Sequence, residues 1–151
     1  MRKEPKNYSD WLEMVPKYLL DDPLWKFETY KKACFLNDLT WFDCGRLMDD
    51  HRGKSIAYQL IRSAGSVSAN IEEGYGRGFG KDYARFLRIA LGSARESRGW
   101  YHRAQYILDE SVLVHRIELL DEIIIGLVLT SQKQTNLGSK KPATRHSQTR
   151  K

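Results

Sequence analysis

Arginine is the residue type in this chain whose spacing most plainly suggests chemistry. Between residues 77 and 103 seven basic residues face only two acidic ones, Asp82 and Glu96. The basic residues are Arg77, Lys81, Arg85, Arg88, Arg95, Arg98 and Arg103. A guanidinium group pairs with phosphate through two parallel hydrogen bonds and stacks on flat rings. This segment is therefore a candidate surface for nucleic acid.

A helix must position these arginines. Apolar and small residues recur from Tyr83 to Leu108 at steps of three and four, which is typical of the buried face of an α-helix. At about 100° per residue, the arginines fall on the opposite, outward face, together with His102 and Tyr106. A face that only confers solubility would mix both signs of charge. Two interpretations remain open, a nucleic-acid interface and an ordinary solvated face.

The C-terminal residues add a second basic element. Of the 25 Lys and Arg residues, 6 lie in residues 133–151, and the other 19 balance the 19 Asp and Glu residues. The net charge of +6 therefore belongs to this end of the chain. Its polar composition cannot bury enough apolar surface to fold alone. We expect residues 135–151 to be a disordered basic tail that supplements the arginine face.

Four helices are expected in all. Gly74, Gly76, Gly78 and Gly80 separate two amphipathic patterns and allow a sharp reversal of the chain. Before them, Asp22 and Pro23 predict the start of a helix that reaches Met48. Its expected inward stripe is Phe27, Cys34, Trp41 and Met48. Short connections make neighbouring helices antiparallel. The predicted fold is all-α, an up-down-up-down antiparallel four-helix bundle in residues 23–134.

Residues 1–22 are expected to form an N-terminal extension. Ser9 or Asp10 can cap a short helix there, and Pro16 stops it. Cys34 and Cys44 fall in the next helix, about 15 Å apart. That separation prevents a disulfide within one chain. The two cysteines are therefore expected to be small, partly buried residues.

The last predicted helix has more apolar residues than one buried stripe needs. Residues 123–129 are apolar on every side, whereas a single stripe needs three or four apolar positions in two turns. The surplus predicts an oligomer interface at Ile123, Ile125, Val128 and Leu129. The alternative is a helix at the centre of the bundle.

Enzyme signatures are absent from the sequence. Lys81 is followed by Asp82 and not by Ser or Thr, which excludes a Walker A loop, and no Glu-x-x-His occurs to build a di-iron site. No catalytic, cofactor-binding or metal-binding residue is predicted. No run reaches the about 18 apolar residues of a membrane span, and residues 1–10 lack the apolar core of a signal peptide. We expect a cytoplasmic protein without a membrane partner.

One part of the sequence resembles a known family. The residues Ala69-Asn70-Ile71, Glu73-Gly74 and Tyr83 to Ser93, reading YARFLRIALGS, resemble the small bacterial four-helix-bundle proteins encoded in intervening sequences of 23S ribosomal RNA genes. The resemblance covers residues 24–132, and Ser68 stands where the family commonly has proline. Asn70 and Glu73 of this motif are expected to cap or bond the glycine turn and not to act in catalysis. It implies the bundle fold and no established catalytic activity. Related bundle proteins, including accessory proteins of diversity-generating retroelements, form five-membered rings, accompany reverse transcriptases and contact nucleic acid, which implies a homopentamer.

These observations predict a non-enzymatic, oligomeric accessory protein that binds RNA or DNA through the arginine face. The alternative is a protein-interaction scaffold that docks an enzyme partner, such as a reverse transcriptase, without touching nucleic acid. An enzyme with a site between subunits is the least favoured interpretation.

Overall fold

The chain folds into helices, without any strand among residues 2–139, which are the residues that the computed structural model describes. This confirms the all-α class. The helices are α1 (Tyr8–Met14), α2 (Lys17–Leu20), α3 (Glu28–Met48), α4 (Gly53–Gly76), α5 (Lys81–Arg103) and α6 (Glu110–Ser139). Two 3₁₀ turns, Pro23–Lys26 and Ala104–Tyr106, join them. Most of the predicted basic tail, residues 140–151, lies outside the described residues.

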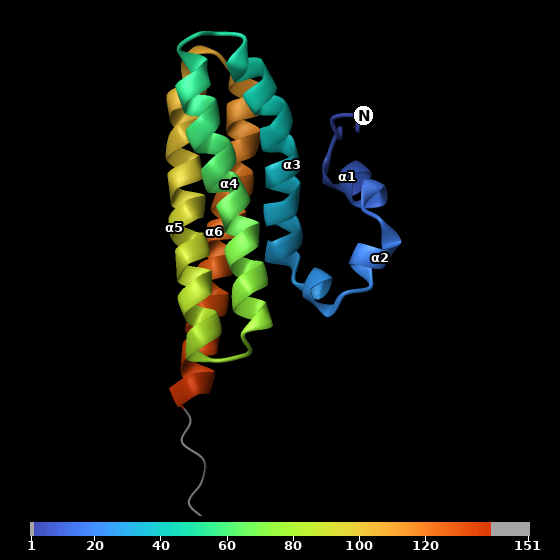
Figure 1. The fold of residues 1–151 in the computed structure, drawn as a ribbon, viewed down its shortest axis with the longest axis vertical. Coiled ribbons are helices and arrows are strands. Elements are labelled where there is room, and N and C mark those ends of the chain that lie inside the picture. Colours follow the sequence, from blue (N-terminus) through green and yellow to red (C-terminus); the bar gives the residue numbers. More distant parts are fainter. Residues whose placement is uncertain (1, 140–151) are drawn as a thin grey trace, which may run out of the picture.

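The four long helices lie side by side (Figure 1). Helix α3 packs against α4 and α6, and α5 packs against the same two neighbours. Successive long helices run in opposite directions, and α1 and α2 lie outside them, beside α3 (Figure 1). Each of α3, α4, α5 and α6 therefore has one face turned inward and one turned outward.

Three helix boundaries differ from the prediction. The cap of α1 is Asn7, whose side chain accepts a hydrogen bond from the Asp10 amide, and not Ser9 or Asp10. Asp22 does act as a cap, but for the 3₁₀ turn, and α3 begins only at Glu28. Helix α6 continues to Ser139, so residues 135–139 are helical and not part of a tail.

The N-terminal extension is attached to α3 through aromatic packing. The indole N–H of Trp11 donates to Asp38 at 2.7 Å. The Trp11 ring also lies 6.2 Å from that of Trp25 and 5.4 Å from that of Phe35, measured between centroids. Buried aromatic side chains contribute large apolar areas. Residues 8–25 therefore cover the outer face of α3.

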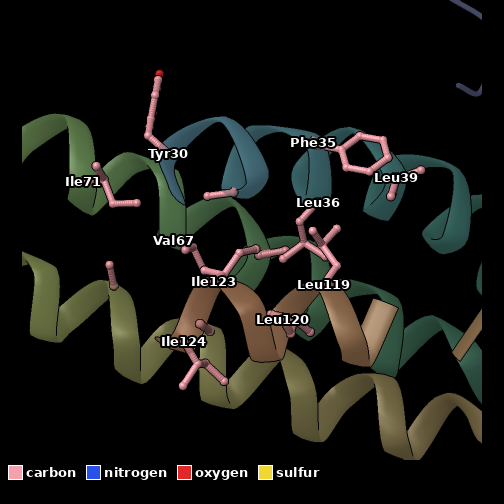
Figure 2. Packing of buried hydrophobic residues seen from close by; sticks show 14 of the residues in the cluster. Tyr30, Phe35, Leu36, Leu39, Val67, Ile71, Leu119, Leu120, Ile123 and Ile124 are labelled. Carbon is pink, nitrogen blue, oxygen red and sulfur yellow. The ribbon is translucent and has the colours of Figure 1, made fainter. Parts of the chain in front are cut away.

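The core fills the space between the four long helices. Leu36, Val67 and Ile123 point into it from α3, α4 and α6 (Figure 2). Ile123 is fully buried within its own chain, so its predicted place in an oligomer interface is wrong. Between α4 and α5 the side chains are small, and the Ser97 hydroxyl donates to that of Ser63 at 2.9 Å. This contact shows how closely α4 and α5 approach at these two serines.

Helices α3 and α6 approach closely at Gly126. A Cβ atom added to this glycine would lie 2.0 Å from Thr29 Oγ1 and 3.0 Å from Thr29 Cγ2. No side chain larger than hydrogen fits between the two helices at this height. Gly126 therefore interrupts the apolar run of α6 for a steric reason.

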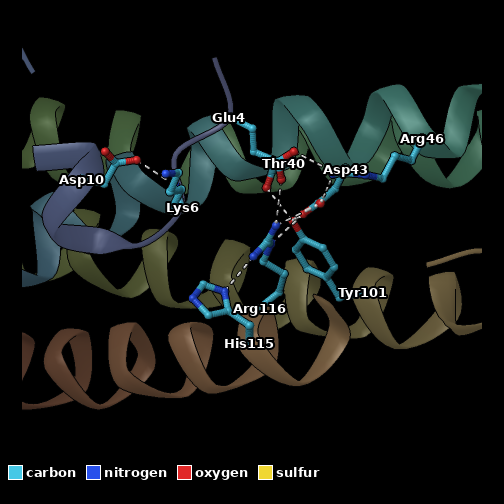
Figure 3. A network of polar contacts seen from close by, with 9 residues as sticks. All are labelled: Glu4, Lys6, Asp10, Thr40, Asp43, Arg46, Tyr101, His115 and Arg116. Carbon is cyan, nitrogen blue, oxygen red and sulfur yellow. Dashed lines mark hydrogen bonds and ion pairs between the residues drawn. The ribbon is translucent and has the colours of Figure 1, made fainter. Parts of the chain in front are cut away.

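Buried charges join three of the long helices (Figure 3). Asp43 of α3 is fully buried and accepts two hydrogen bonds from Arg116 of α6, from Nε at 2.7 Å and from Nη2 at 3.1 Å. The Tyr101 hydroxyl of α5 donates to the same carboxylate at 2.8 Å. Because its single proton goes to Asp43, the hydroxyl of Thr40, 2.9 Å away, is the donor to Tyr101.

The surroundings of this pair complete its hydrogen bonds. Arg46 donates to Asp43 at 3.0 Å, and Glu4 of the N-terminal segment contacts both Arg46 and Arg116. Burial, and then the Asp43 carboxylate, raise the pKa of Tyr101 well above its ordinary value. The phenol therefore stays protonated and keeps donating. Among residues 2–139 no buried side-chain polar atom lacks a partner.

The close approach at Gly126 makes a first prediction. We expect Gly126→Ala to lower the free energy of unfolding by about 1–3 kcal/mol through overpacking against Thr29. Adding Thr29→Ala should recover part of that loss. Gly45→Ala is the matched control, since it has open space within helix α3 and should raise stability by up to about 1 kcal/mol. Urea unfolding at one protein concentration measures the wild type and all three variants, and an equal change in the free energy of unfolding for the two single glycine variants would contradict the close approach.

The buried ion pair makes a second prediction. We expect Asp43→Ala to cost about 3–5 kcal/mol, because it removes the two hydrogen bonds that compensate the buried Arg116 charge and leaves, within residues 2–139, only the 3.7 Å ion pair with Glu4. Asp121→Ala removes the half-exposed partner of Arg98 and should cost about 0–1 kcal/mol. The double variant Asp43→Leu with Arg116→Met should recover much of the loss, since no charge remains buried. Chemical denaturation checks this, and a loss for Asp43→Ala as small as that for Asp121→Ala would refute the role of the pair.

Candidate functional site

Helix α5 turns its basic residues outward. Its buried side is formed by Tyr83, Ala84, Leu87, Ala90, Ala94, Ser97 and Tyr101, which face the other long helices. Lys81, Arg85, Arg88, Arg95 and Arg103 are exposed, whereas Arg98 is half-buried. We call Lys81, Arg85, Arg88, Arg95 and Arg103 the α5 basic face. The residue Arg77, also predicted for the site, is exposed at the end of α4.

A glycine turn joins α4 to α5 and sets where the basic face begins. Gly78 and Gly80 have φ of 111° and 83°, a conformation that other residues rarely adopt. The Gly80 amide donates to Gln134 Oε1 of α6 at 2.9 Å. Gly74 lets the two helices meet, since an added Cβ would lie 2.6 Å from that of Phe86. The turn is thus held against both α5 and α6.

Two arginines meet over one aromatic ring beside this turn. The guanidinium carbons of Arg77 and Arg85 lie 5.1 and 5.6 Å from the centroid of Phe86. Both distances are within the range of a cation–π contact. The neighbouring Phe79 is 79% exposed. We call Arg77, Phe79, Lys81, Arg85 and Phe86 the turn cluster; periodicity alone did not reveal it, because Phe79 belongs to neither helix.

Carboxylates from other positions neutralise part of the predicted arginine surface. Arg98 donates to Asp121 of α6 at 2.7 Å, and Arg77 donates to Glu73 at 2.9 Å. Glu96 lies on α5 itself and pairs with Arg62 of α4. The expectation that this face carries only arginine is therefore wrong. Arg98 contributes least to the predicted surface, because Asp121 of the neighbouring helix α6 compensates the charge of Arg98.

The other basic residues keep their charge available. Within residues 2–139, none of the five members of the α5 basic face forms an ion pair. Arg88 donates to the hydroxyl of Thr135 at 2.8 Å, and the guanidinium of Arg103 lies 4.8 Å from the ring of Trp100. Neutral partners hold these side chains in place and leave donors for an anionic ligand.

Two residues of the resemblance motif behave differently from each other. Glu73 bonds Arg77 next to the glycine turn, as expected. Asn70, which was also expected to bond this turn, instead donates to the carbonyl and the hydroxyl of Ser66, at 2.8 and 2.9 Å. Its amide reaches back along α4 because Ser66 lies one helical turn before it.

An apolar groove lies between α3 and α4. It measures about 320 Å³ and is lined by Trp41, Cys44, Gly45, Met48, Ala57, Tyr58 and Ile61. Trp41 and Tyr58 are exposed. The predicted inward stripe of α3 was therefore wrong for Trp41 and Met48, because the buried Asp43 and Leu47 turn them outward.

Helix α6 carries a second group of exposed apolar residues, with the exposed Glu118, Glu122 and Lys133 between them in the sequence. Ile125 and Leu129 are 60% and 61% exposed, Val114 and Leu137 are also exposed, and Val128 is half-buried. We call Val114, Ile125, Leu129 and Leu137 the α6 stripe. Of the four predicted interface residues, Ile125 and Leu129 lie on it, and Ile123 does not.

Of the two cysteines, Cys44 lines the groove between α3 and α4, and Cys34 does not. Burial raises the pKa of the Cys34 and Cys44 thiols to about 12, and both cysteines are free. Among residues 2–139 no three His, Cys, Asp or Glu side chains are arranged to hold a metal ion. None of the helices described for that range is long and apolar enough to cross a membrane.

The fold is similar to a crystal structure from Bacteroides thetaiotaomicron VPI-5482, a protein with unknown function from the S23 ribosomal protein family. The two chains superpose with a TM-score of 0.61 at 20% identity, over 74% of this chain and 99% of the other. At this identity the likeness concerns the fold. None of the curated proteins matches the chain.

A family model supplies the remaining comparison. The model of the 23S rRNA-intervening sequence protein matches residues 26–126, which is more than half of the chain. The match begins just before α3 and ends within α6, so it includes the glycine turn and the whole α5 basic face. The chain belongs to the family of 23S rRNA-intervening sequence proteins.

Proposed function

We propose that this chain is a non-enzymatic, oligomeric accessory protein that binds nucleic acid through the α5 basic face. In this proposal its long helices form an up-down-up-down bundle that acts as a rigid support. The observation that carries the proposal is the outward row of Lys81, Arg85, Arg88, Arg95 and Arg103, which lacks ion pairs within residues 2–139. Cations left without carboxylates are available to phosphates.

The dimensions of α5 favour a polyanion over a small ligand. Its 23 residues span about 34 Å, at 1.5 Å per residue. The basic side chains are spread along this length and do not converge on one pocket. A phosphate backbone offers negative charges at regular intervals along a comparable distance. The face therefore suits several phosphate contacts made one after another.

We further propose that copies of the chain associate through their two apolar surfaces. The α6 stripe and the groove between α3 and α4 lie on different helices and are both exposed. An interface that joins two different patches repeats from copy to copy, and it closes into a ring when the rotation between copies returns to the first one. A homopentamer is the ring that the family resemblance implies. A ring repeats the α5 basic face, and several copies bind a long polyanion with avidity.

The runner-up is the scaffold that docks an enzyme partner. The observation that favours it is the same groove, because Trp41 and Tyr58 are residue types enriched at protein interfaces. The two functions differ in what fills the groove, a second copy or a different protein. A chain that stays monomeric and binds no nucleic acid would support the scaffold.

The α5 basic face makes a third prediction. The triple variant Arg85→Gln, Arg88→Gln, Arg95→Gln should lose most of its affinity for RNA or DNA at low salt. For a single strand, its salt slope should fall by about 0.7 for each arginine that contacts a phosphate. The control triple Lys17→Gln, Lys26→Gln, Lys54→Gln removes the same charge from exposed sites elsewhere and should bind nearly as the wild type does.

Fluorescence anisotropy with structured RNA, single-stranded DNA and duplex DNA measures both triples. Circular dichroism should show equal helicity for both, because none of the six side chains is buried. Equal losses of affinity in the two triple variants would mean that binding depends only on net charge and not on the α5 basic face. Absence of wild-type binding to all three probes at low salt would refute the proposed function.

The two apolar surfaces make a fourth prediction. Ile125→Glu disrupts the α6 stripe and Trp41→Glu disrupts the groove, so each variant alone should be monomeric by light scattering, near 17.6 kDa. Mixing the two should give a dimer of one copy each, since the intact stripe of one fits the intact groove of the other. Each dimer then ends in two damaged surfaces and cannot grow.

The mixture separates this arrangement from a symmetric one. If α6 packed against α6 of a second copy, mixing would restore nothing, because Ile125→Glu would damage that interface in every mixed pair. Leu19→Glu is the control, since it places a charge on an exposed apolar residue outside both surfaces and should leave the oligomer intact. A monomeric wild-type chain at micromolar concentration would refute the assembly.

A further inference from the structure

Phe79 occupies an unusual place at the tip of the turn between α4 and α5. Its side chain is 79% exposed, and the glycines on either side have positive φ. The Gly80 amide is fixed to Gln134, so the backbone on the C-terminal side of Phe79 is held against α6. A large apolar ring is thus held in solvent by a short and anchored turn.

Basic residues lie close to Phe79 in the sequence. Arg77 and Lys81 each lie two residues away in sequence, and Arg85 lies with Arg77 over the ring of Phe86. The shared contact with Phe86 keeps two guanidinium groups on the same part of the surface. An exposed aromatic among basic side chains is the combination that binds single-stranded nucleic acid, because a base stacks on the ring while cations bind phosphates.

A protein partner fits these surroundings less well. Aromatic residues that anchor protein interfaces are typically surrounded by further contacts that exclude water. The immediate neighbours of Phe79 are Gly78 and Gly80, which have no side chains, followed by Arg77 and Lys81. The groove around Trp41, in contrast, is lined by several apolar side chains from two helices.

We propose that the turn cluster binds an unpaired base of a single-stranded nucleic acid, with the base stacked on Phe79 and the flanking phosphates on Lys81 and Arg85, which form no ion pair within residues 2–139. The proposal rests on the proposed function and specifies its ligand. In a duplex both faces of each internal base are covered by neighbouring bases, so a protruding ring gains nothing there. The α5 basic face then holds the strand that continues from the turn.

The test compares one strand in two forms. A labelled 15-nucleotide RNA without self-complementarity is titrated by anisotropy, first alone and then as a duplex with flush ends closed by hairpin loops of non-nucleotide linker. We expect Phe79→Ala to weaken binding of the single strand about 5- to 100-fold, the range measured for loss of one stacked base. Binding of the closed duplex should stay unchanged. Phe79→Trp should bind the single strand at least as well as the wild type.

The salt dependence separates stacking from charge. Because Phe79→Ala removes no charge, its loss of affinity should be the same at every salt concentration, with an unchanged slope. Tyr18→Ala removes an equally exposed aromatic ring from α2 and should have no effect. Thermal melting should be the same for all these variants, since neither ring is buried.

Each result decides a different claim. If Phe79→Ala binds the single strand as the wild type does while the arginine triple fails, the stacking proposal is wrong and the proposed function stands. Equal losses on the single strand and the closed duplex would also overturn stacking on an unpaired base. If the wild type binds neither form at low salt, both proposals fail together. The exposed Phe79 would then be a candidate contact for a protein partner.

Discussion

The buried ion pair between Asp43 and Arg116 constrains the rotation of three helices at once. Taking two charges out of water costs several kcal/mol per ion unless the geometry is good and the remaining hydrogen bonds are made. Here the guanidinium meets the carboxylate with two hydrogen bonds, and Tyr101 supplies a third. Helices α3, α5 and α6 must therefore keep the one rotation about their axes that brings these side chains together. An apolar core would tolerate a wider range of rotations.

Both candidate surfaces follow from that constraint. Because Asp43 and Leu47 point inward, Trp41 on α3 points outward and the groove against α4 opens. Because Tyr101 is held inside, the opposite side of α5 is turned to solvent, and Arg95 and Arg88 are exposed. The glycine turn adds a second fixed point through Gly80 and Gln134. Internal polar contacts thus determine which residues of a helix are available for binding.

Local periodicity predicted the long helices and the glycine turn well, since each depends on residues close in sequence. It failed where the deciding partner is remote. Asp43 and Arg116 are 73 residues apart, and an apolar stripe drawn without this pair placed Trp41 and Met48 in the core. Charged residues at core positions of two helices, one of each sign, were the available signal. Likewise no pattern within α5 indicates that Asp121 of α6 neutralises Arg98.

The distribution of surfaces over the helices bears on how binding and assembly relate. The apolar surfaces belong to α3, α4 and α6, whereas the basic face belongs to α5 and the turn before it. In the proposed ring, the copies contact one another through the apolar surfaces. The basic face takes no part in these contacts, so assembly need not compete with a bound strand. On α6, Gln134 and Thr135 contact Gly80 and Arg88. A copy that packs against α6 would then also act on these contacts, which would couple assembly to affinity beyond the gain from avidity.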